Sequence, residues 1–166
     1  MEKEQIEAEY IAMIKQHQGI VHKVCNMYCQ GDKEDKQDLF QEILIQLWKA
    51  YPSFRHESKI STWMYRVALN TAISNMRKQK NSIKKVDIAA PALKISEVEY
   101  DYEYEEKLKF LNQAIEQLND IEKAIVMLYL EEKSYEEISE IVGITPNYVG
   151  VKMNRIKEKL KKMIKN

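Results

Sequence analysis

The sequence contains few of the residues that turns, crosslinks and membrane spans require. Its 166 residues include only 4 glycines and 3 prolines, fewer than an all-β chain needs for its turns. The 2 cysteines are too few for a disulfide framework. The longest apolar run, residues 124–130, is far too short to cross a bilayer, and the polar, acidic N-terminus does not resemble a secretory signal. We therefore expect a helical, cytoplasmic protein with no membrane insertion.

Catalytic motifs are also absent. The 3 histidines form no triad with a nucleophile, and there is no glycine-rich phosphate loop. His22, Cys25 and Cys29 are spaced like ligands on one helical face, but a structural zinc ion normally takes four ligands and no fourth is evident nearby. Packing of the cysteines in a core is the favoured interpretation. We expect neither an enzyme nor a bound metal or cofactor.

Net charge is missing too, because 26 basic residues balance 26 acidic ones, yet the charges are strongly segregated. Residues 77–85 carry five basic side chains and no acidic one, whereas residues 97–106 carry six acidic side chains and no basic one. Residues 150–166 carry seven basic side chains against one acidic side chain. Local potential attracts a polyanion more than net charge does, so both basic segments are candidate nucleic-acid contacts.

Apolar residues recur at three- and four-residue steps along most of the chain, which is the period of amphipathic helices. The pattern predicts either one long helix over residues 4–30 or two helices divided near Gly19. A second helix is predicted to begin at an N-cap on Asp35 and to end before Pro52. A third is predicted to begin at residue 61 or 62.

The helical period disappears over residues 82–106 and resumes afterwards, while no strand pattern is present. We therefore predict an all-α fold with two small helical domains, residues 1–81 and 107–166. Residues 82–106 are predicted to be a flexible acidic linker between them.

The C-terminal domain carries the signature of a helix-turn-helix. Ser134 and Glu137 form a capping box, and Gly143 is the residue type that ends a helix in the left-handed conformation. Thr145 as N-cap, followed by Pro146, begins the next helix. A short helix, a glycine-containing turn and a longer basic helix in this order indicate DNA binding. An ordinary helical hairpin with a solvated basic tail is the alternative.

The second helix of a helix-turn-helix enters the major groove with its N-terminal residues against the base edges. One of these, Gly150, weakens the helix by about 1 kcal/mol relative to alanine, so we expect it to permit close approach of a backbone, of DNA or of protein. The face predicted to pack inward consists of Ile144, Val149, Met153 and Ile156. The predicted DNA contacts are Asn147, Tyr148, Gly150, Val151, Lys152 and Arg155.

The helix predicted after residue 60 has a polar stripe that core packing does not require. Single-stranded nucleic acid is bound by aromatic platforms with a cationic track, and an extruded base by a small polar pocket. Trp63 and Tyr65, taken alone, are more typical of a core. The stripe consists of Arg66, Asn70, Ser74 and Arg77. The candidates for base and phosphate contacts are Phe54, Arg55, Asn70, Lys78 and Lys80.

The stretch DLFQEILIQLWKAYPSFRHESKISTWMYRVALNTAISNMRK resembles region 2 of the extracytoplasmic-function (ECF) sigma factors of bacterial RNA polymerase. The stretch LNDIEKAIVMLYLEEKSYEEISEIVGITPNYVGVKMNRIKEKL resembles their region 4. The resemblance implies a protein that binds core RNA polymerase, directs it to specific promoters and initiates transcription. It implies that region 2 melts and reads the −10 element of the promoter DNA and that region 4 reads the −35 element.

The resemblance also assigns roles to residues. The family's Asp-x-x-Gln-Glu pattern docks on the polymerase, although in any helix such acids can simply cap and solvate its start. Trp63 and Tyr65 are implied to support the loop that captures a flipped base. The implied polymerase contacts are Asp38, Gln41 and Glu42, with Asp35 just ahead. The implied −10 contacts are Phe54, Arg55, Trp63, Tyr65, Arg66, Asn70, Arg77 and Lys78.

Two other functions remain as alternatives. One is a sigma-like decoy or adaptor that sequesters an anti-sigma protein, but such proteins usually lose DNA-facing residues and this chain retains Asn70 and Arg77. The other is a plain DNA-binding repressor, which leaves the polymerase-docking pattern unexplained. An anti-sigma factor is a further partner that the resemblance implies. We also hypothesise that the acidic residues 97–106 cover the basic C-terminal helix in the free protein.

Overall fold

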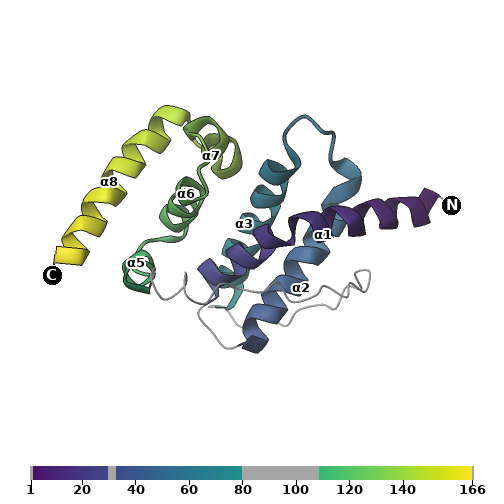
Figure 1. The fold of residues 1–166 in the computed structure, drawn as a ribbon, viewed down its shortest axis with the longest axis horizontal. Helices are drawn as coiled ribbons and strands as arrows, with labels where there is room; N and C mark the ends of the chain where they lie inside the picture. Colours follow the sequence, from purple (N-terminus) through teal and green to yellow (C-terminus); the bar gives the residue numbers. More distant parts are fainter. Residues whose placement is uncertain (1, 30–32, 80–108, 166) are drawn as a thin grey trace. The chain divides into compact units, whose positions relative to one another are not determined.

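The computed structural model describes residues 2–29, 33–79 and 109–165, and none of these residues is in a β-strand (Figure 1). The chain divides into two compact units, Met1–Glu97 and Val98–Asn166. The predicted all-α class with two small helical domains is therefore confirmed. The predicted linker, with its acidic segment, and Lys80 lie outside the described residues.

The described part of the first unit consists of helices α1 (Glu2–Tyr28), α2 (Lys33–Ala50) and α3 (Ile60–Gln79), with a short 3-10 helix, η1 (Tyr51–Ser53). The three α-helices all contact one another and enclose a common core (Figure 1). Apolar side chains at helical spacing on each helix supply this core, as their periodicity predicts. Its largest fully buried members are Tyr10, Ile14, Val21, Val24, Ile43, Leu47 and Met64.

Two helix features differ in position from the sequence prediction. The break predicted near Gly19 is a kink at His17, where φ is −116° and ψ is 18°. Helix α2 already begins at Lys33, so Asp35 lies in its first turn and the prediction of an N-cap at Asp35 is wrong. An acidic side chain at any position of the first turn, here Glu34 or Asp35, interacts favourably with the helix dipole, so such residues indicate a helix start without identifying its N-cap.

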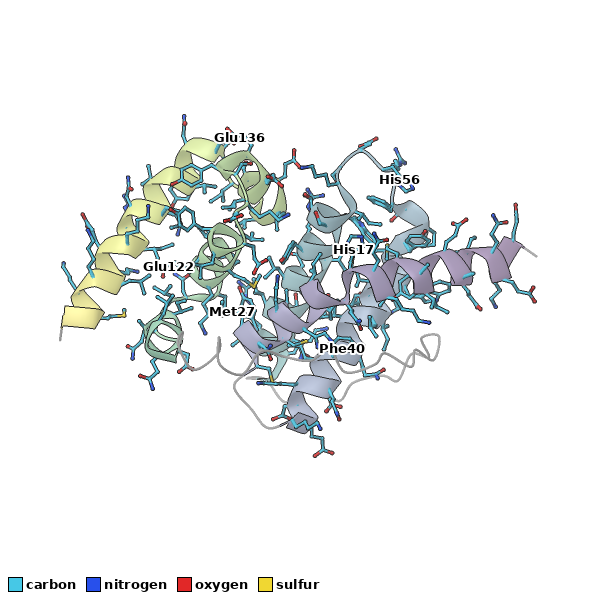
Figure 2. All side chains as sticks on the ribbon, viewed as in Figure 1. His17, Met27, Phe40, His56, Glu122 and Glu136 are labelled. Carbon is cyan, nitrogen blue, oxygen red and sulfur yellow. The ribbon has the colours of Figure 1, made fainter. Side chains whose placement is uncertain are left out.

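The chain passes from α2 to α3 through η1 and a short loop. Helix α2 ends at Ala50, before Pro52, as predicted, and Pro52 itself lies in η1. The Phe54 N–H donates to the Tyr51 carbonyl, the first of η1, at 3.1 Å. His56, labelled in Figure 2, has a φ of 58°, a left-handed conformation in which histidine is enriched. Helix α3 begins at Ile60, one or two residues earlier than the predicted start at residue 61 or 62.

The second unit contains helices α5 (Lys109–Ile115), α6 (Asp120–Leu130), α7 (Tyr135–Val142) and α8 (Pro146–Lys165). Helix α8 contacts the other three, and α6 also contacts α7. No helix in the described ranges is long and apolar enough to cross a membrane. The largest fully buried side chains of this unit are Ile115, Ile125, Leu128, Ile138 and Ile156.

The predicted helix-turn-helix is confirmed in α7 and α8, including the predicted helix caps at Ser134, Gly143 and Thr145. The Ser134 hydroxyl accepts from the Glu137 N–H at 3.1 Å, and the Glu137 carboxylate accepts from the Ser134 N–H at 3.3 Å. Gly143 ends α7 with a φ of 85°. The Thr145 hydroxyl then accepts from the Tyr148 N–H at 3.2 Å and begins α8. The capping box thus begins α7, and Gly143 with the Thr145 cap fixes the turn between the two helices.

Candidate nucleic-acid and polymerase interfaces

A chain of aromatic rings supports the loop before α3. The Phe54 ring lies 4.8 Å from the Trp63 ring, centroid to centroid, with 33° between their planes. Trp63 in turn lies 6.3 Å from Tyr51, and Tyr51 lies 5.8 Å from Tyr10. The Tyr10 hydroxyl donates to the Leu44 carbonyl of α2 at 2.6 Å. Phe54 is half-buried, so one part of its ring rests on the core while the remainder faces solvent.

Two of the predicted −10 contacts lie in the core instead. Trp63 is 8% exposed and Tyr65 is 3% exposed, so both side chains lie mainly in the core and offer little surface to a DNA strand. Their assignment as −10 contacts stays a prediction. The implied role of Trp63 as a support for the loop fits its ring contact with Phe54. Burial is decided by how three helices meet, which the spacing within α3 alone does not fix.

The polar stripe of α3 faces outward. Asn70, Ser74 and Arg77 are exposed, and Arg66 is half-buried. Arg55 of the preceding loop and Lys78 at the end of α3 are exposed as well. The predicted −10 contacts in the described ranges thus lie on the loop and on the outer face of one helix, apart from the buried Trp63 and Tyr65 noted above.

An open depression of about 250 Å³ lies where α2 and α3 meet. It brings Asn70, a predicted base contact, together with Glu42, a predicted polymerase contact. Asn75, whose burial the sequence does not signal, also lines it and is only 8% exposed. The remaining lining residues are Gln46, Thr71, Ser74 and Lys78. The packing of α2 on α3 therefore joins two surfaces that the sequence treats as separate.

The predicted polymerase contacts lie on one face of α2. Asp35, Asp38 and Gln41 are exposed, at spacings of three residues that keep them on neighbouring turns. Glu42 is half-buried, and its carboxylate accepts a hydrogen bond from the Gln46 amide at 3.2 Å. The face is acidic and polar, and it is suited to a basic partner surface.

The basic helix α8 has a buried face and an exposed face. Val149, Met153 and Ile156 are buried, as predicted, while Ile144 before the helix is half-buried. The exposed face carries Asn147, Tyr148, Val151 and Arg155. The half-buried Lys152 lies at its edge, with its ammonium nitrogen 5.5 Å from the centroid of the Tyr148 ring.

Gly150 is not required by packing within the described structure. A Cβ added there would lie 3.5 Å from the Tyr135 ring, an ordinary van der Waals distance. The expected close approach of a protein backbone is therefore not found among the described residues, because the nearest group is a side chain. Close approach of a DNA backbone remains a prediction.

The residues considered as metal ligands do not form a metal site among the described residues. Burial, followed by the nearby Cys29, raises the pKa of Cys25 to about 12, which makes its thiol unreactive. The His22 ring lies 4.7 Å from the Phe40 ring, and burial lowers the pKa of His22. Within the described ranges, no three histidine, cysteine or acidic side chains converge as a metal site.

Comparison with known proteins decides the family. The family model of Sigma-70 region 2 matches residues 13–82, and that of Sigma-70 region 4 matches residues 111–160. The ECF RNA polymerase sigma-E factor of Escherichia coli K12 is 32% identical over 149 residues, which cover 82% of this chain and 78% of that protein. The chain belongs to the ECF sigma factors. Members of this family bind RNA polymerase and promoter DNA.

One further curated relative is similar in sequence, and two solved structures are similar in fold. The RNA polymerase sigma-H factor of Pseudomonas aeruginosa is 26% identical over 156 residues, covering 86% of this chain and 81% of that protein. The fold resembles that of CnrH, solved in complex with the cytosolic domain of CnrY, with a TM-score of 0.66, 13% identity and coverage of 96% and 95%. It also resembles RpoE of Bartonella quintana, solved with the anti-sigma factor NepR, with a TM-score of 0.60, 17% identity and coverage of 99% and 97%.

A long-range ion pair holds the basic helix of this sigma factor in place. Glu122, labelled in Figure 2, accepts from the Lys159 ammonium at 2.8 Å and from the Asn119 N–H at 3.2 Å. The Asn119 side chain accepts in return from the Glu122 N–H at 2.8 Å. Burial alone would raise the pKa of Glu122, but the hydrogen bonds from Lys159 and Asn119 and the lysine charges lower it overall. The start of α6 is thereby tied to α8.

Replacing Glu122 by glutamine is expected to destabilise the second unit by about 1 kcal/mol at neutral pH. A hydrogen bond to a charged group contributes about 1.5–3 kcal/mol, reduced here because the Lys159 side chain is 53% exposed. Glutamine keeps the capping box, so only the charge is removed. Because folding lowers the pKa of Glu122 below its ordinary value of 4.5, the ionised carboxylate stabilises the fold at pH values above 4.5. The difference in the free energy of unfolding between the wild type and Glu122→Gln should therefore shrink as the pH falls below 4.5. Hydrogen exchange in α6 and α8, followed for both proteins at several pH values, would measure this difference in stability.

A difference that stays constant with pH would contradict the ion-pair explanation. Glu122→Ala is the matched variant, because it removes both the ion pair and the reciprocal capping bond. It should cost about 1 kcal/mol more than Glu122→Gln at every pH.

Proposed function

We propose that this ECF sigma factor docks on core RNA polymerase through α2, melts and reads the −10 element with region 2, and reads the −35 element with region 4. The observation that carries the proposal is that each unit presents the surface its role needs. The first has an aromatic loop beside an exposed polar helix face. The second has a capped helix-turn-helix whose basic second helix is exposed over its N-terminal turns.

The first unit can hold a separated strand. A base that leaves the duplex needs an aromatic face to stack on and hydrogen-bonding groups for its edge. Phe54, fixed from behind by Trp63, supplies the aromatic face. Asn70 can both donate and accept. Arg55, Arg77 and Lys78, all exposed, lie on the loop and α3 and can contact the phosphates.

The second unit can hold intact duplex. In α8 Asn147 is exposed and lies in the first turn, two residues after the Thr145 cap, which is where a recognition helix meets the base edges. Arg155, two turns further along, is exposed and can bind a base edge or a phosphate. The buried face of α8 meanwhile holds the helix on α6 and α7.

The acidic face of α2 is the proposed polymerase contact. Asp38 and Gln41 are exposed, and their replacement should leave the core intact. Each of the two similar solved structures contains a partner: CnrH is in complex with the cytosolic domain of CnrY, and RpoE is in complex with the anti-sigma factor NepR. We extend this to an anti-sigma partner for the present protein, and we place its action in the cytoplasm, where polymerase and promoter are.

A transcription assay with purified core polymerase and a promoter library tests the proposal. We expect specific transcripts only when the protein and the polymerase are both present. The double variant Asp38→Ala, Gln41→Ala should lose polymerase association and transcripts while keeping its thermal stability. Specific DNA binding without polymerase would instead indicate a repressor. Failure to bind polymerase together with tight binding of an anti-sigma protein would indicate a decoy.

A further inference from the structure

The exposed face of α8 carries two large apolar side chains. Tyr148 and Val151 are each 43% exposed. They are three residues apart, so they lie side by side on consecutive turns of the helix. Among the side chains whose exposure the structure describes, the other large apolar ones that are exposed are Ile6, Tyr129 and Leu130, none of them on α8. A recognition helix thus presents an apolar pair on its exposed face, within its first two turns.

Polar and cationic groups surround this pair. Asn147 precedes it, and Arg155 follows it one turn later on the same face, both exposed. The Lys152 ammonium lies over the Tyr148 ring, 5.5 Å from its centroid, which restrains both side chains. The surface therefore suits an anionic partner that offers a small apolar group between polar edges.

The major groove of DNA has one such apolar group, the C5-methyl group of thymine. All other base-edge features in that groove are hydrogen-bond donors or acceptors, apart from the bare C5–H of cytosine. A valine side chain cannot recognise guanine or adenine by hydrogen bonding, because it has no polar atom. Its exposure on this helix is explained if it meets a methyl group there.

Resting on the proposed reading of the −35 element by α8, we propose that Tyr148 and Val151 select thymine in that element by contacting its methyl groups. Lys152, held by the Tyr148 ring, is then directed to the adjacent phosphates, and Arg155 to a neighbouring base or phosphate. This chain therefore prefers −35 elements with thymine, on either strand, opposite the first two turns of α8.

Deoxyuridine substitution tests the proposal, because uracil lacks only the methyl group of thymine. The full-length protein with core polymerase is bound to a promoter recovered in the transcription assay above. Each thymine of the −35 duplex is then replaced by deoxyuridine in turn. We expect about four-fold weaker binding at each contacted position, since burying one methyl-sized group contributes about 0.8 kcal/mol. Thymines outside the element serve as internal controls.

Protein variants identify the contacting side chain. Val151→Ala should bind the thymine promoter about four-fold more weakly and should lose the response to deoxyuridine at one position. Tyr148→Phe keeps the ring and should retain the response, whereas Tyr148→Ala should lose it at the other position. Binding that is specific but insensitive to deoxyuridine would overturn the inference and leave the proposed function standing.

Two further outcomes count against the inference. A Val151→Ala variant that associates more weakly with core polymerase, with an unchanged deoxyuridine response, would show that the apolar pair meets protein instead of DNA. Absence of any specific promoter binding by the complex would overturn the proposed function, and the inference with it.

Discussion

Replacing Trp63 by alanine is expected to lower the free energy of unfolding of the first unit by about 3–5 kcal/mol. Trp63 is 8% exposed and its ring contacts both Phe54 and Tyr51, so truncation leaves a cavity beneath the loop. The chain has 2 tryptophans, and both belong to this unit. Trp48 therefore remains in the variant as a fluorescent reporter of the unfolding of that unit alone, measured in urea.

The matched variant is Trp63→Phe, which keeps an aromatic ring beneath the loop. It should cost clearly less than alanine and should preserve promoter opening, whereas Trp63→Ala should lose opening even at temperatures where the unit stays folded. A cost below about 1 kcal/mol for Trp63→Ala would mean that the ring is not a significant part of the core, and the support that we assign to it would be wrong.

Features that depend on neighbours in the sequence could be predicted well. The Ser134–Glu137 capping box and the left-handed Gly143 involve groups within one turn, so residue type and spacing determine them. The buried face of α8 follows from the three- and four-residue period in the same way. The all-α class is the sum of such local preferences. The prediction of an N-cap at Asp35 failed because two neighbouring acidic residues, Glu34 and Asp35, both occupy that first turn.

Features that depend on how helices meet could not be predicted. Glu122 and Lys159 are separated by 37 residues, and nothing in the local pattern pairs them. Likewise, the polar type of Asn75 suggests a solvent-facing position, yet packing of α2 on α3 leaves it 8% exposed. For the same reason Tyr65, an aromatic residue beside a polar stripe, is consistent with either a base platform or a core position until the tertiary contacts are known.

The shared depression between α2 and α3 affects how the two interfaces of the first unit must be tested. Because Glu42 and Asn70 line the same depression, a substitution at either position can disturb the surroundings of the other. Loss of promoter opening in an Asn70 variant is therefore informative only when polymerase affinity is measured on the same protein. Phe54 lies on the loop and packs on Trp63, so its variants separate the two effects more cleanly.

Substitutions at Phe54 and Asn70 are expected to impair promoter opening without impairing polymerase binding. Stacking of one base on an aromatic ring contributes about 1–3 kcal/mol, so Phe54→Leu should slow opening by about 5- to 150-fold. Leucine keeps an apolar contact with Trp63, which separates the loss of the aromatic face from the loss of packing. Fluorescence of 2-aminopurine placed in the −10 element would follow opening on duplex promoter DNA.

Asn70→Ala should slow opening by about ten-fold, because a base edge would lose its hydrogen-bonding partner inside the complex. Asn26→Ala, at a half-buried asparagine of α1 outside the polar stripe, is the matched control and should open promoters normally. A promoter already unpaired across the −10 element should rescue part of both losses, since the cost of unstacking the base has then been removed. If both variants open duplex promoters at the normal rate, the separated strand is held elsewhere on the molecule.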